Sequence, residues 1–198
     1  MKIIVTGFGQ FLENETNPTK EIINMLPQKT GDKEIFPVEL PVVFDECFLK
    51  LKSYIDDLKP DVIVMLGLAG GRLAITPERV AINIKDANGP DNNGYQPKDE
   101  VIVQGGKEAY FSTLPIREIE KELKESNIPV LVSNSAGLYV CNNIMYHVLN
   151  YIDNNDLNCL AGFIHVPYMT ENKPKANVFS LPLDEIYTAI MKIIEIVL

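Results

Sequence analysis

Apolar runs of strand length alternate along this chain with segments whose apolar residues recur at helical spacing. Strands are predicted at 2–6, 35–40, 62–66, 128–133 and 160–166. The run at 62–66 is continuous, which is typical of a parallel strand covered on both faces. A further, half-buried strand is predicted at 79–85, where apolar and polar residues alternate. This order favours an α/β fold, with a single domain over 1–198 and a mostly parallel twisted sheet bearing helices on both faces.

Helices are predicted between these strands. Asn17 followed by Pro18 indicates a helix start, with Asn as the cap, and this helix is expected to reach about residue 26. Apolar residues at three- and four-residue steps predict a second helix at 44–58. Further helices are predicted at 115–126, 138–151 and 183–198. The stretch 86–99 is rich in Asp, Asn, Gly and Pro, and it predicts a long loop of the kind that is usually functional or mobile.

Composition excludes several classes of protein. Of 198 residues, 46% are hydrophobic and 23% charged, which is ordinary for a globular protein and argues against extensive disorder. Asp and Glu number 27 against 18 Lys and Arg, so the formal charge of −9 disfavours binding to nucleic acid or an anionic membrane. Apolar stretches are too short for a membrane span, and the apolar start is too short for a signal peptide. We expect a cytoplasmic protein with free thiols.

Cysteine is the first residue type with candidate chemistry. Cys47, Cys141 and Cys159 are three in number without CxxC spacing, so neither a disulfide framework nor a four-cysteine zinc site fits. Cys141 follows a predicted strand and turn and falls in the first turn of a predicted helix, where the helix dipole favours a thiolate. It is a candidate nucleophile, although a buried structural cysteine fits the same pattern. Cys47 and Cys159 are interpreted as structural.

The chain has two histidines, His147 and His165. His147 lies six positions after Cys141 on the same predicted helix, about 240° around its axis, so the two side chains face apart. His165 comes at the end of a predicted strand. Because the carboxyl ends of parallel strands share one edge of a sheet, where ligands bind, His165 is the better candidate base for Cys141.

A nucleophile and base of this kind need a group that orients the imidazole. The candidates are Glu78, Asp86, Asp91 and Glu171, and spacing alone does not choose among them. Cys141, His165 and Glu78 could instead hold a metal, but they lack the usual ligand spacing. The turn at 67–72 is rich in glycine and lacks the pattern of a phosphate-binding loop. We expect its backbone to approach a ligand closely, and we expect no metal at these residues.

Several segments resemble the pyroglutamyl peptidase I family of cysteine peptidases, also called pyrrolidone-carboxylate peptidases. They are the stretches at 6–8, 67–72, 77–83, 110–115, 133–142 and 162–168, and they follow the family's order over nearly the whole chain. The resemblance implies an α/β fold and a Cys-His-Glu triad carried by Cys141, His165 and Glu78. It also implies removal of N-terminal pyroglutamate from peptides through a thioester acyl-enzyme, without a metal or cofactor, by a homo-oligomer, either a dimer or a tetramer.

The resemblance implies a substrate pocket as well. Phe8, Phe11, Leu68, Tyr139 and Val140 stand at the family's pocket positions, with Leu68 in the turn expected to offer backbone contacts to the lactam ring. Ordinary core packing of the two phenylalanines is an alternative. The family's oxyanion is expected to be stabilised at Cys141 and in the loop at 86–88.

Three positions depart from the family's pattern. Gln10 and Leu12 replace a proline and a glycine, and Asn88 stands where many members carry an arginine that helps to stabilise the oxyanion. An amide can still donate a hydrogen bond but lacks the charge, so weaker activity is one expectation. The rival hypothesis is therefore a protein of the same fold that binds a lactam or peptide with weakened catalysis or none. Retention of all three triad residues argues against it.

Overall fold

The computed structural model describes residues 1–11 and 16–197, so the departure at Leu12 lies outside the described residues. Its centre is a six-stranded sheet in the order β2-β3-β1-β4-β10-β5. The four inner strands are parallel, whereas β2 and β5 pair antiparallel at the two ends. The predicted mostly parallel α/β fold is thus confirmed. The strands are β1 (Lys2–Phe8), β2 (Lys29–Thr30), β3 (Lys33–Leu40), β4 (Val62–Leu68), β5 (Thr76–Pro77) and β10 (Leu160–Val166).

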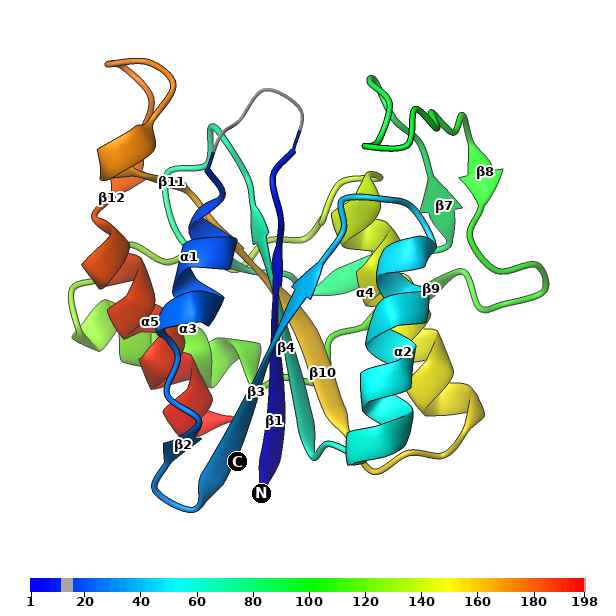
Figure 1. The fold of residues 1–198 in the computed structure, drawn as a ribbon, viewed down its shortest axis with the longest axis horizontal. Coiled ribbons are helices and arrows are strands. Elements are labelled where there is room, and N and C mark those ends of the chain that lie inside the picture. The colour runs from blue at the N-terminus through cyan, green and yellow to red at the C-terminus, as the bar shows by residue number, and fades with distance from the viewer. Residues whose placement is uncertain (12–15, 198) are drawn as a thin grey trace.

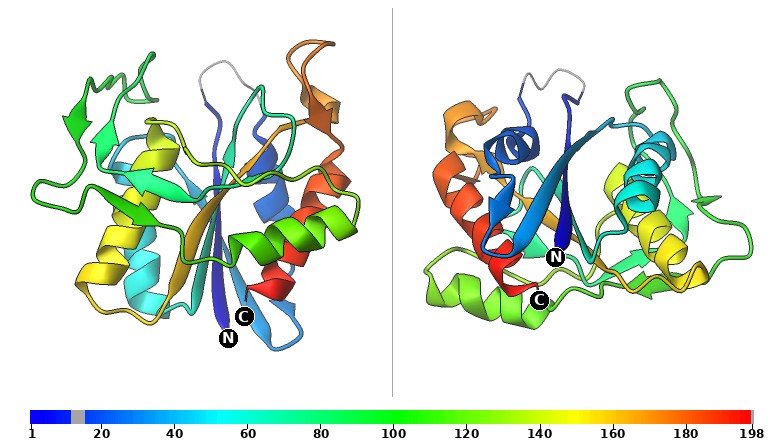
Figure 2. Two further views of the ribbon diagram at one scale, coloured as in Figure 1. Left: turned by 180° about the vertical axis from the view of Figure 1, so that it is seen from behind. Right: turned by 60° about the horizontal axis from the view of Figure 1, so that its bottom comes forward.

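Five helices cover the described part of the sheet on its two faces (Figure 1). One layer comprises α1 (Pro18–Met25), α3 (Ile116–Glu125) and α5 (Leu183–Ile196). The other comprises α2 (Glu46–Leu58) and α4 (Val140–Asn154). The right-hand view of Figure 2 shows the sheet between these layers. Asn17 caps α1 as predicted, because its side chain accepts a hydrogen bond from the Thr19 N–H.

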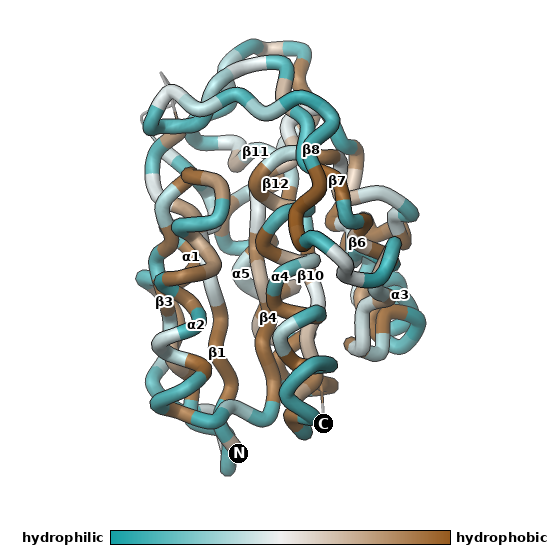
Figure 3. The backbone as a smooth tube through the Cα atoms, turned by 90° about the vertical axis from the view of Figure 1, so that its right-hand side faces the viewer, coloured by the Kyte–Doolittle hydropathy of each residue, from teal (hydrophilic) through white to brown (hydrophobic). Residues whose placement is uncertain are grey.

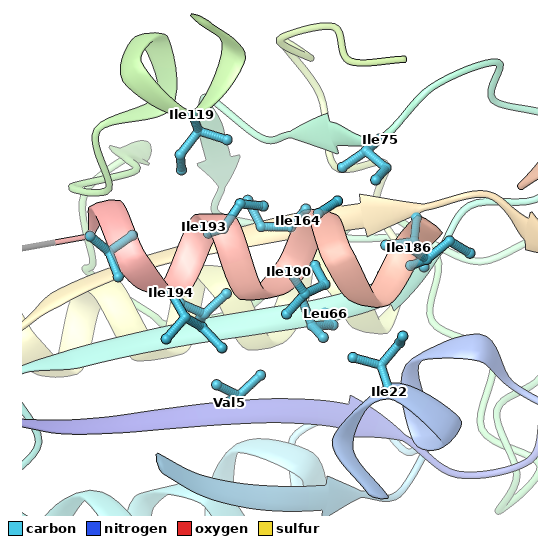
Figure 4. Close-up of a cluster of buried hydrophobic side chains, with 14 of the residues drawn as sticks. Val5, Ile22, Leu66, Ile75, Ile119, Ile164, Ile186, Ile190, Ile193 and Ile194 are labelled. Atoms are coloured by element: carbon cyan, nitrogen blue, oxygen red, sulfur yellow. The ribbon is translucent and has the colours of Figure 1, made fainter. Parts of the chain in front are cut away.

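Each face of the sheet has its own apolar core because successive strand residues point to opposite sides. Val5 of β1 packs with the α1, α3 and α5 side, whereas its neighbour Ile4 packs with α2 and α4. Figure 4 shows isoleucines of α5, among them Ile190, between α1 and α3. Figure 3 shows that β1 and β4 are hydrophobic over most of their length, as a strand buried on both faces requires.

Within the described residues, three small sheets lie outside the central one. The predicted single strand at 79–85 is wrong, because the chain there forms two short strands separated by Asn83 and paired with different partners. No helix or strand interrupts the predicted loop, since β7 ends at Lys85 and β8 begins at Glu100. The pairs are β6 (Val80–Ile82) with β9 (Ala109–Phe111), β7 (Ile84–Lys85) with β8 (Glu100–Val101), and β11 (Tyr168–Met169) with β12 (Ser180–Leu181); a short 3-10 helix, η1 (Thr170–Asn172), follows β11.

The predicted strand at 128–133 does not form. The segment runs parallel to residues 75–79 but makes only two isolated bridges, Ile75 with Val130 and Glu78 with Ser133. Backbone hydrogen bonds flank each of the two bridges. The hydrogen bond that would connect the bridges into one continuous ladder requires residue 77 to donate its backbone N–H. That residue is Pro77, which has no N–H to donate, so the ladder is interrupted there.

The carboxyl ends of the parallel strands meet at one edge of the sheet, at the top of Figure 1. The loops after β4 and β10 and the start of α4 converge there, which is where open α/β sheets bind ligands. In the described part of the chain, no helix is long and apolar enough to cross a membrane.

Candidate active site

Cys141 is the second residue of α4, which begins at Val140. The chain reaches this point through a turn in which Gly137 has a φ of +76°, a conformation that glycine adopts without strain. The Cys141 side chain is half-buried at the helix N-terminus. Its thiol therefore lies in the first helical turn, as the sequence predicted, near the positive end of the helix dipole.

Gly67 of β4 allows the thiol to approach the sheet. A Cβ atom at Gly67 would lie 3.1 Å from the Cys141 Sγ and 2.6 Å from the Phe163 ring, so a side chain does not fit there. In the parallel register of β4 and β10, Gly67 is the partner of His165. The thiol thus lies against the strand position next to the histidine, and the structure brings these two candidates to one place.

His165 and Glu78 form a buried pair. Nδ1 of His165 lies 2.7 Å from Glu78 Oε1, and the two side chains are 4% and 0% exposed. The antiparallel pairing of β5 with β10 sets Thr76 opposite His165, and the Glu78 N–H then donates to the Phe163 carbonyl at 2.9 Å. A carboxylate only accepts hydrogen bonds, so Nδ1 carries the proton and Nε2 is left as the base.

The other candidate orienting groups lie elsewhere. Asp91 accepts hydrogen bonds from backbone N–H groups of its own loop and of Phe44. Asp86 pairs with Lys98, and Glu171 accepts from the Leu183 N–H. Of the four candidates, Glu78 is the one that the structure places against His165.

Burial dominates the acid–base properties of the site. It raises the pKa of the Cys141 thiol to about 12, the negative charge of Glu78 adds to this effect, and the Arg72 guanidinium opposes it. Burial also lowers the pKa of His165 below its usual value, against the opposing effect of the Glu78 hydrogen bond. Both groups are therefore neutral at rest, and the thiol must lose its proton to a base as it reacts.

A cavity of about 110 Å³ opens beside the thiol, and we call it the ring cavity. For comparison, an apolar protein cavity of about 150 Å³ holds a benzene molecule. All five predicted pocket residues lie in its wall, together with three further ones. Its lining is Phe8, Phe11, Asn17, Val42, Leu68, Tyr139, Val140 and Cys141.

Backbone groups border the ring cavity where two strands separate. Pairing between β1 and β4 ends at Thr6 and Met65, although β4 continues to Leu68 alongside β10. The last residues of β4 therefore extend past the paired part of β1. Because the polar groups of an unpaired strand edge need partners, this edge can offer hydrogen bonds to a ligand.

Asn88 lies in a different place from the ring cavity. It lines a larger hollow of about 550 Å³ that shares two aromatic residues, Phe11 and Tyr139, with the ring cavity. Asp86, Ala87, Gly89 and Leu138 complete its wall. The structure therefore places Asn88 near the site, in the wall of the larger hollow rather than in the wall of the ring cavity that contains the thiol.

The remaining cysteines and His147 lie outside the site. Cys47 is fully buried, and burial raises the pKa of its thiol well above its usual value. Burial likewise raises the pKa of the half-buried Cys159 to about 12. His147 pairs with Asp45 instead of Cys141, as expected from its position on the helix. Within the described residues, no group of three or more His, Cys, Asp or Glu side chains is arranged to hold a metal ion.

Sequence reasoning missed three residues of this region. Asn17 was identified only as a helix cap, and Val42 belonged to no motif, yet both line the ring cavity. Arg72 was seen only as part of a glycine-rich turn, but its Nη1 donates to the Glu78 carboxylate. The one available signal for Arg72 was a charged residue at the end of a turn that follows a central strand.

A thiol at a helix N-terminus beside an imidazole–carboxylate pair is the arrangement of a cysteine hydrolase. Comparison with known proteins defines the family more narrowly. The family model described as pyroglutamyl peptidase matches residues 1–198, and the chain belongs to this family.

Relatives in other organisms agree over nearly the full length. The chain is 46% identical to the pyrrolidone-carboxylate peptidase of Brachyspira hyodysenteriae, over 98% of both chains. It resembles the crystal structure of pyroglutamyl peptidase I from Bacillus amyloliquefaciens with a TM-score of 0.94 and 40% identity, covering 99% of this chain and 95% of that one. A variant of the pyrrolidone carboxyl peptidase from Pyrococcus furiosus gives a TM-score of 0.95 and 42% identity, covering 100% and 98% of the two chains.

Proposed function

We propose that this protein is a cysteine peptidase that removes an N-terminal pyroglutamyl residue from peptides, with Cys141, His165 and Glu78 as its catalytic triad. The observation that carries the proposal is the buried pair of His165 and Glu78, next to a thiol that opens into a cavity fit for one small ring. Membership of the pyroglutamyl peptidase family supplies the substrate class.

The ring cavity suits a flat, uncharged lactam. Phe8, Phe11 and Tyr139 give it apolar and aromatic walls, and the free edge of β4 at Leu68 offers backbone groups to the lactam N–H and C=O. An ordinary peptide N-terminus carries an ammonium group, which would lose its hydration in such a cavity without a compensating charge. The cavity therefore selects the cyclised residue over an uncyclised one.

The reaction begins when the Cys141 sulfur attacks the carbonyl carbon that joins pyroglutamate to the next residue. Nε2 of His165 takes the thiol proton and then gives it to the departing amine, while Glu78 stabilises the transient imidazolium. A thioester joins the pyroglutamyl group to Cys141. Water, deprotonated by His165, then attacks this thioester and releases pyroglutamate and the free thiol.

The oxyanion of the tetrahedral intermediates needs hydrogen-bond donors. The Cys141 backbone N–H, at the start of α4, is the donor that the helix dipole also supports. Asn88 is the second predicted donor. Because it lines the neighbouring hollow, its contribution requires the loop at 86–89 to approach the ring cavity when substrate binds.

Turnover of a fluorogenic pyroglutamyl amide tests the proposal. We expect hydrolysis by the wild-type protein and a loss on the order of 10⁴-fold or more in Cys141→Ala, since removal of the nucleophile leaves only binding and oxyanion stabilisation. Cys47→Ala is the matched control, because this buried thiol lies away from the cavity and should affect stability alone. Equal turnover by Cys141→Ala and the wild type would disprove the mechanism.

The rival hypothesis, a lactam-binding protein without turnover, predicts a different outcome. Pyroglutamate analogues would then raise the melting temperature of the wild type while no product forms at high enzyme concentration. Nothing in the site favours this outcome, since a protein that only binds the ring needs no imidazole and carboxylate beside the thiol.

We also propose that the protein works in the cytoplasm as a homo-oligomer. Three free cysteines, one of which must stay reduced to react, suit a reducing compartment. Light scattering of the purified protein distinguishes a dimer or tetramer from a monomer.

A further inference from the structure

The Arg72 guanidinium contacts three residues from two separate segments of the site. Nη1 donates to the Thr76 hydroxyl at 2.5 Å and to Glu78 Oε1, and Nη2 donates to the Ser135 carbonyl at 2.9 Å. Thr76 belongs to β5, and Ser135 belongs to the turn that leads to Cys141. One planar group thus ties the carboxylate of the triad to the turn before the nucleophile, and the mechanism above assigns it no role.

The position of Arg72 is fixed by its own turn. Gly71 has a φ of +94°, and the Arg72 N–H donates back to the Ala69 carbonyl. The Ala69 N–H in turn donates to the Val166 carbonyl, at the end of the strand that holds His165. The turn after β4 is therefore anchored to β10, and it delivers the partly exposed Arg72 guanidinium to the buried Glu78 carboxylate.

Glu78 needs such a partner. Its side chain is 0% exposed, and Oε1 accepts from both His165 Nδ1 and Arg72 Nη1. Within the described residues, Oε2 has no hydrogen-bond partner. An ionised carboxylate in such a place is strongly disfavoured unless a cation contacts it, and a neutral imidazole supplies no charge. Arg72 carries a permanent positive charge and contacts the Glu78 carboxylate directly.

We propose that Arg72 is a positioning residue of the catalytic triad, which holds Glu78 as an oriented carboxylate and fixes the turn before Cys141 to it. The inference rests on the proposed function. Arg72 does not line the ring cavity, so it acts through Glu78 and the turn rather than by touching substrate.

Charge gives this role a signature in the pH dependence of the site. Arg72 acts on the Glu78–His165 pair from the turn after β4, and Cys141 faces the pair from α4. Burial is the main cause of the lowered pKa of His165, and the Arg72 cation lowers this pKa further. Removing the cation therefore raises the pKa of His165, so the acid limb of the activity–pH profile moves to higher pH.

Three variants separate charge from geometry. For Arg72→Gln we expect kcat to fall about 10- to 100-fold, as is typical for a group that orients a reacting side chain, with little change in KM. Its acid limb of kcat/KM should move up by roughly one pH unit or more. Arg72→Lys keeps the charge but cannot reproduce the planar set of donors of the guanidinium. Its kcat should therefore fall while the acid limb stays near that of the wild type.

Arg79→Gln is the matched control. Arg79 lies next to Glu78 in the chain and its Nε donates to the Asn134 side chain in the same turn, but it makes no ion pair with Glu78. Its kcat and acid limb should stay those of the wild type. An Arg72→Gln variant with the wild-type acid limb would overturn the proposal, as would an equal loss in Arg72→Gln and Arg79→Gln. If Arg72→Gln does not fold, a wild-type kcat in Arg72→Lys would overturn it.

A second readout does not depend on turnover. The rate of Cys141 alkylation by iodoacetamide, followed against pH by mass spectrometry, should shift to higher pH in Arg72→Gln because the cation also favours the thiolate. Absence of hydrolysis by the wild type would refute the proposed function. An unchanged alkylation profile in Arg72→Gln would refute the role of Arg72 alone, so the two failures are distinguishable.

Discussion

Two imidazole–carboxylate pairs in this protein have similar contacts and different surroundings. Nδ1 of His165 lies 2.7 Å from Glu78, and Nε2 of His147 lies 3.1 Å from Asp45. The first pair is almost fully buried, whereas Asp45 is 45% exposed. A cysteine also lies near each pair. Cys141 is close to the Glu78–His165 pair in the fold, and Cys47 is close to Asp45 in the sequence.

The surroundings decide what each pair can do. Asp45 is bonded to Lys85 and Asn143 as well as to His147, and the His147 ring stacks on Phe48 at a centroid distance of 4.7 Å. These contacts join α2, α4 and β7, which is a structural role. The Glu78–His165 pair instead faces a half-buried thiol in the wall of a cavity. Proximity of a base and an acid therefore does not define a catalytic site without a nucleophile that a ligand can reach.

Replacement of the histidines gives the largest expected contrast. His165→Ala should lower kcat on the pyroglutamyl amide by roughly 10⁴-fold, because the base and the proton donor are both lost. His147→Ala should leave kcat near the wild-type value and reduce the free energy of unfolding by about 1 kcal/mol. Steady-state kinetics and urea unfolding on both variants check this. A loss of turnover in His147→Ala at unchanged stability would break the distinction between the pairs.

Replacement of the carboxylates tests the same distinction with a smaller change of shape. Glu78→Gln should lower kcat by on the order of 10³- to 10⁴-fold, since an amide neither stabilises the imidazolium nor fixes the correct tautomer. Asp45→Asn should keep kcat and cost about 1 kcal/mol of stability, a modest value because the group is partly exposed. Comparable kcat values in the two variants would show that Glu78 has no special role.

The two pairs should also respond to pH in different ranges. Burial holds the pKa of His165 below 6.5, and hydrolysis needs the neutral imidazole, so kcat/KM should persist below pH 6.5 and fall only as pH drops through this lowered value. The hydrogen bond from His147 lowers the pKa of Asp45 below its usual 3.8. Asp45 therefore contributes stability that is complete above about pH 3.8 and is lost as pH falls toward the folded-state value.

A pH series separates these effects. The difference in urea midpoint between the wild type and Asp45→Asn should stay constant from pH 7 to pH 5 and shrink near pH 3. An acid limb of kcat/KM above pH 6.5 would contradict the neutral resting state of the site. A stability difference that is the same at pH 3 and pH 7 would contradict the ionised state of Asp45.

Much of this architecture follows from local sequence patterns. The strand at 160–166 was predicted at its observed limits, because a short, mostly apolar run is typical of a strand buried on both faces of a sheet. The strand predicted at 128–133 failed for a reason that lies in another segment, since Pro77 interrupts the ladder from the opposite side. Pairing between distant segments is not encoded in the periodicity of either one.

The residues of the site also divide into those with a local sequence signal and those that depend on pairing between distant segments. Cys141 and His165 could be identified from their positions at a helix start and a strand end, which are local signals. Glu78 could not be chosen over Asp86 on spacing, because its contact with His165 depends on the antiparallel pairing of β5 with β10. Arg72 was missed for a similar reason, since its three partners come from two other segments.

The antiparallel pairing of β5 with β10 has a consequence for how activity is gained during folding. Glu78 and His165 are 87 residues apart in the chain, and their contact exists only after β5 has docked on β10. Contacts between such distant residues form late, because closing a long loop is entropically costly. Recovery of turnover in a refolding experiment therefore reports that β5 has docked on β10, which a spectroscopic signal from the helices does not report.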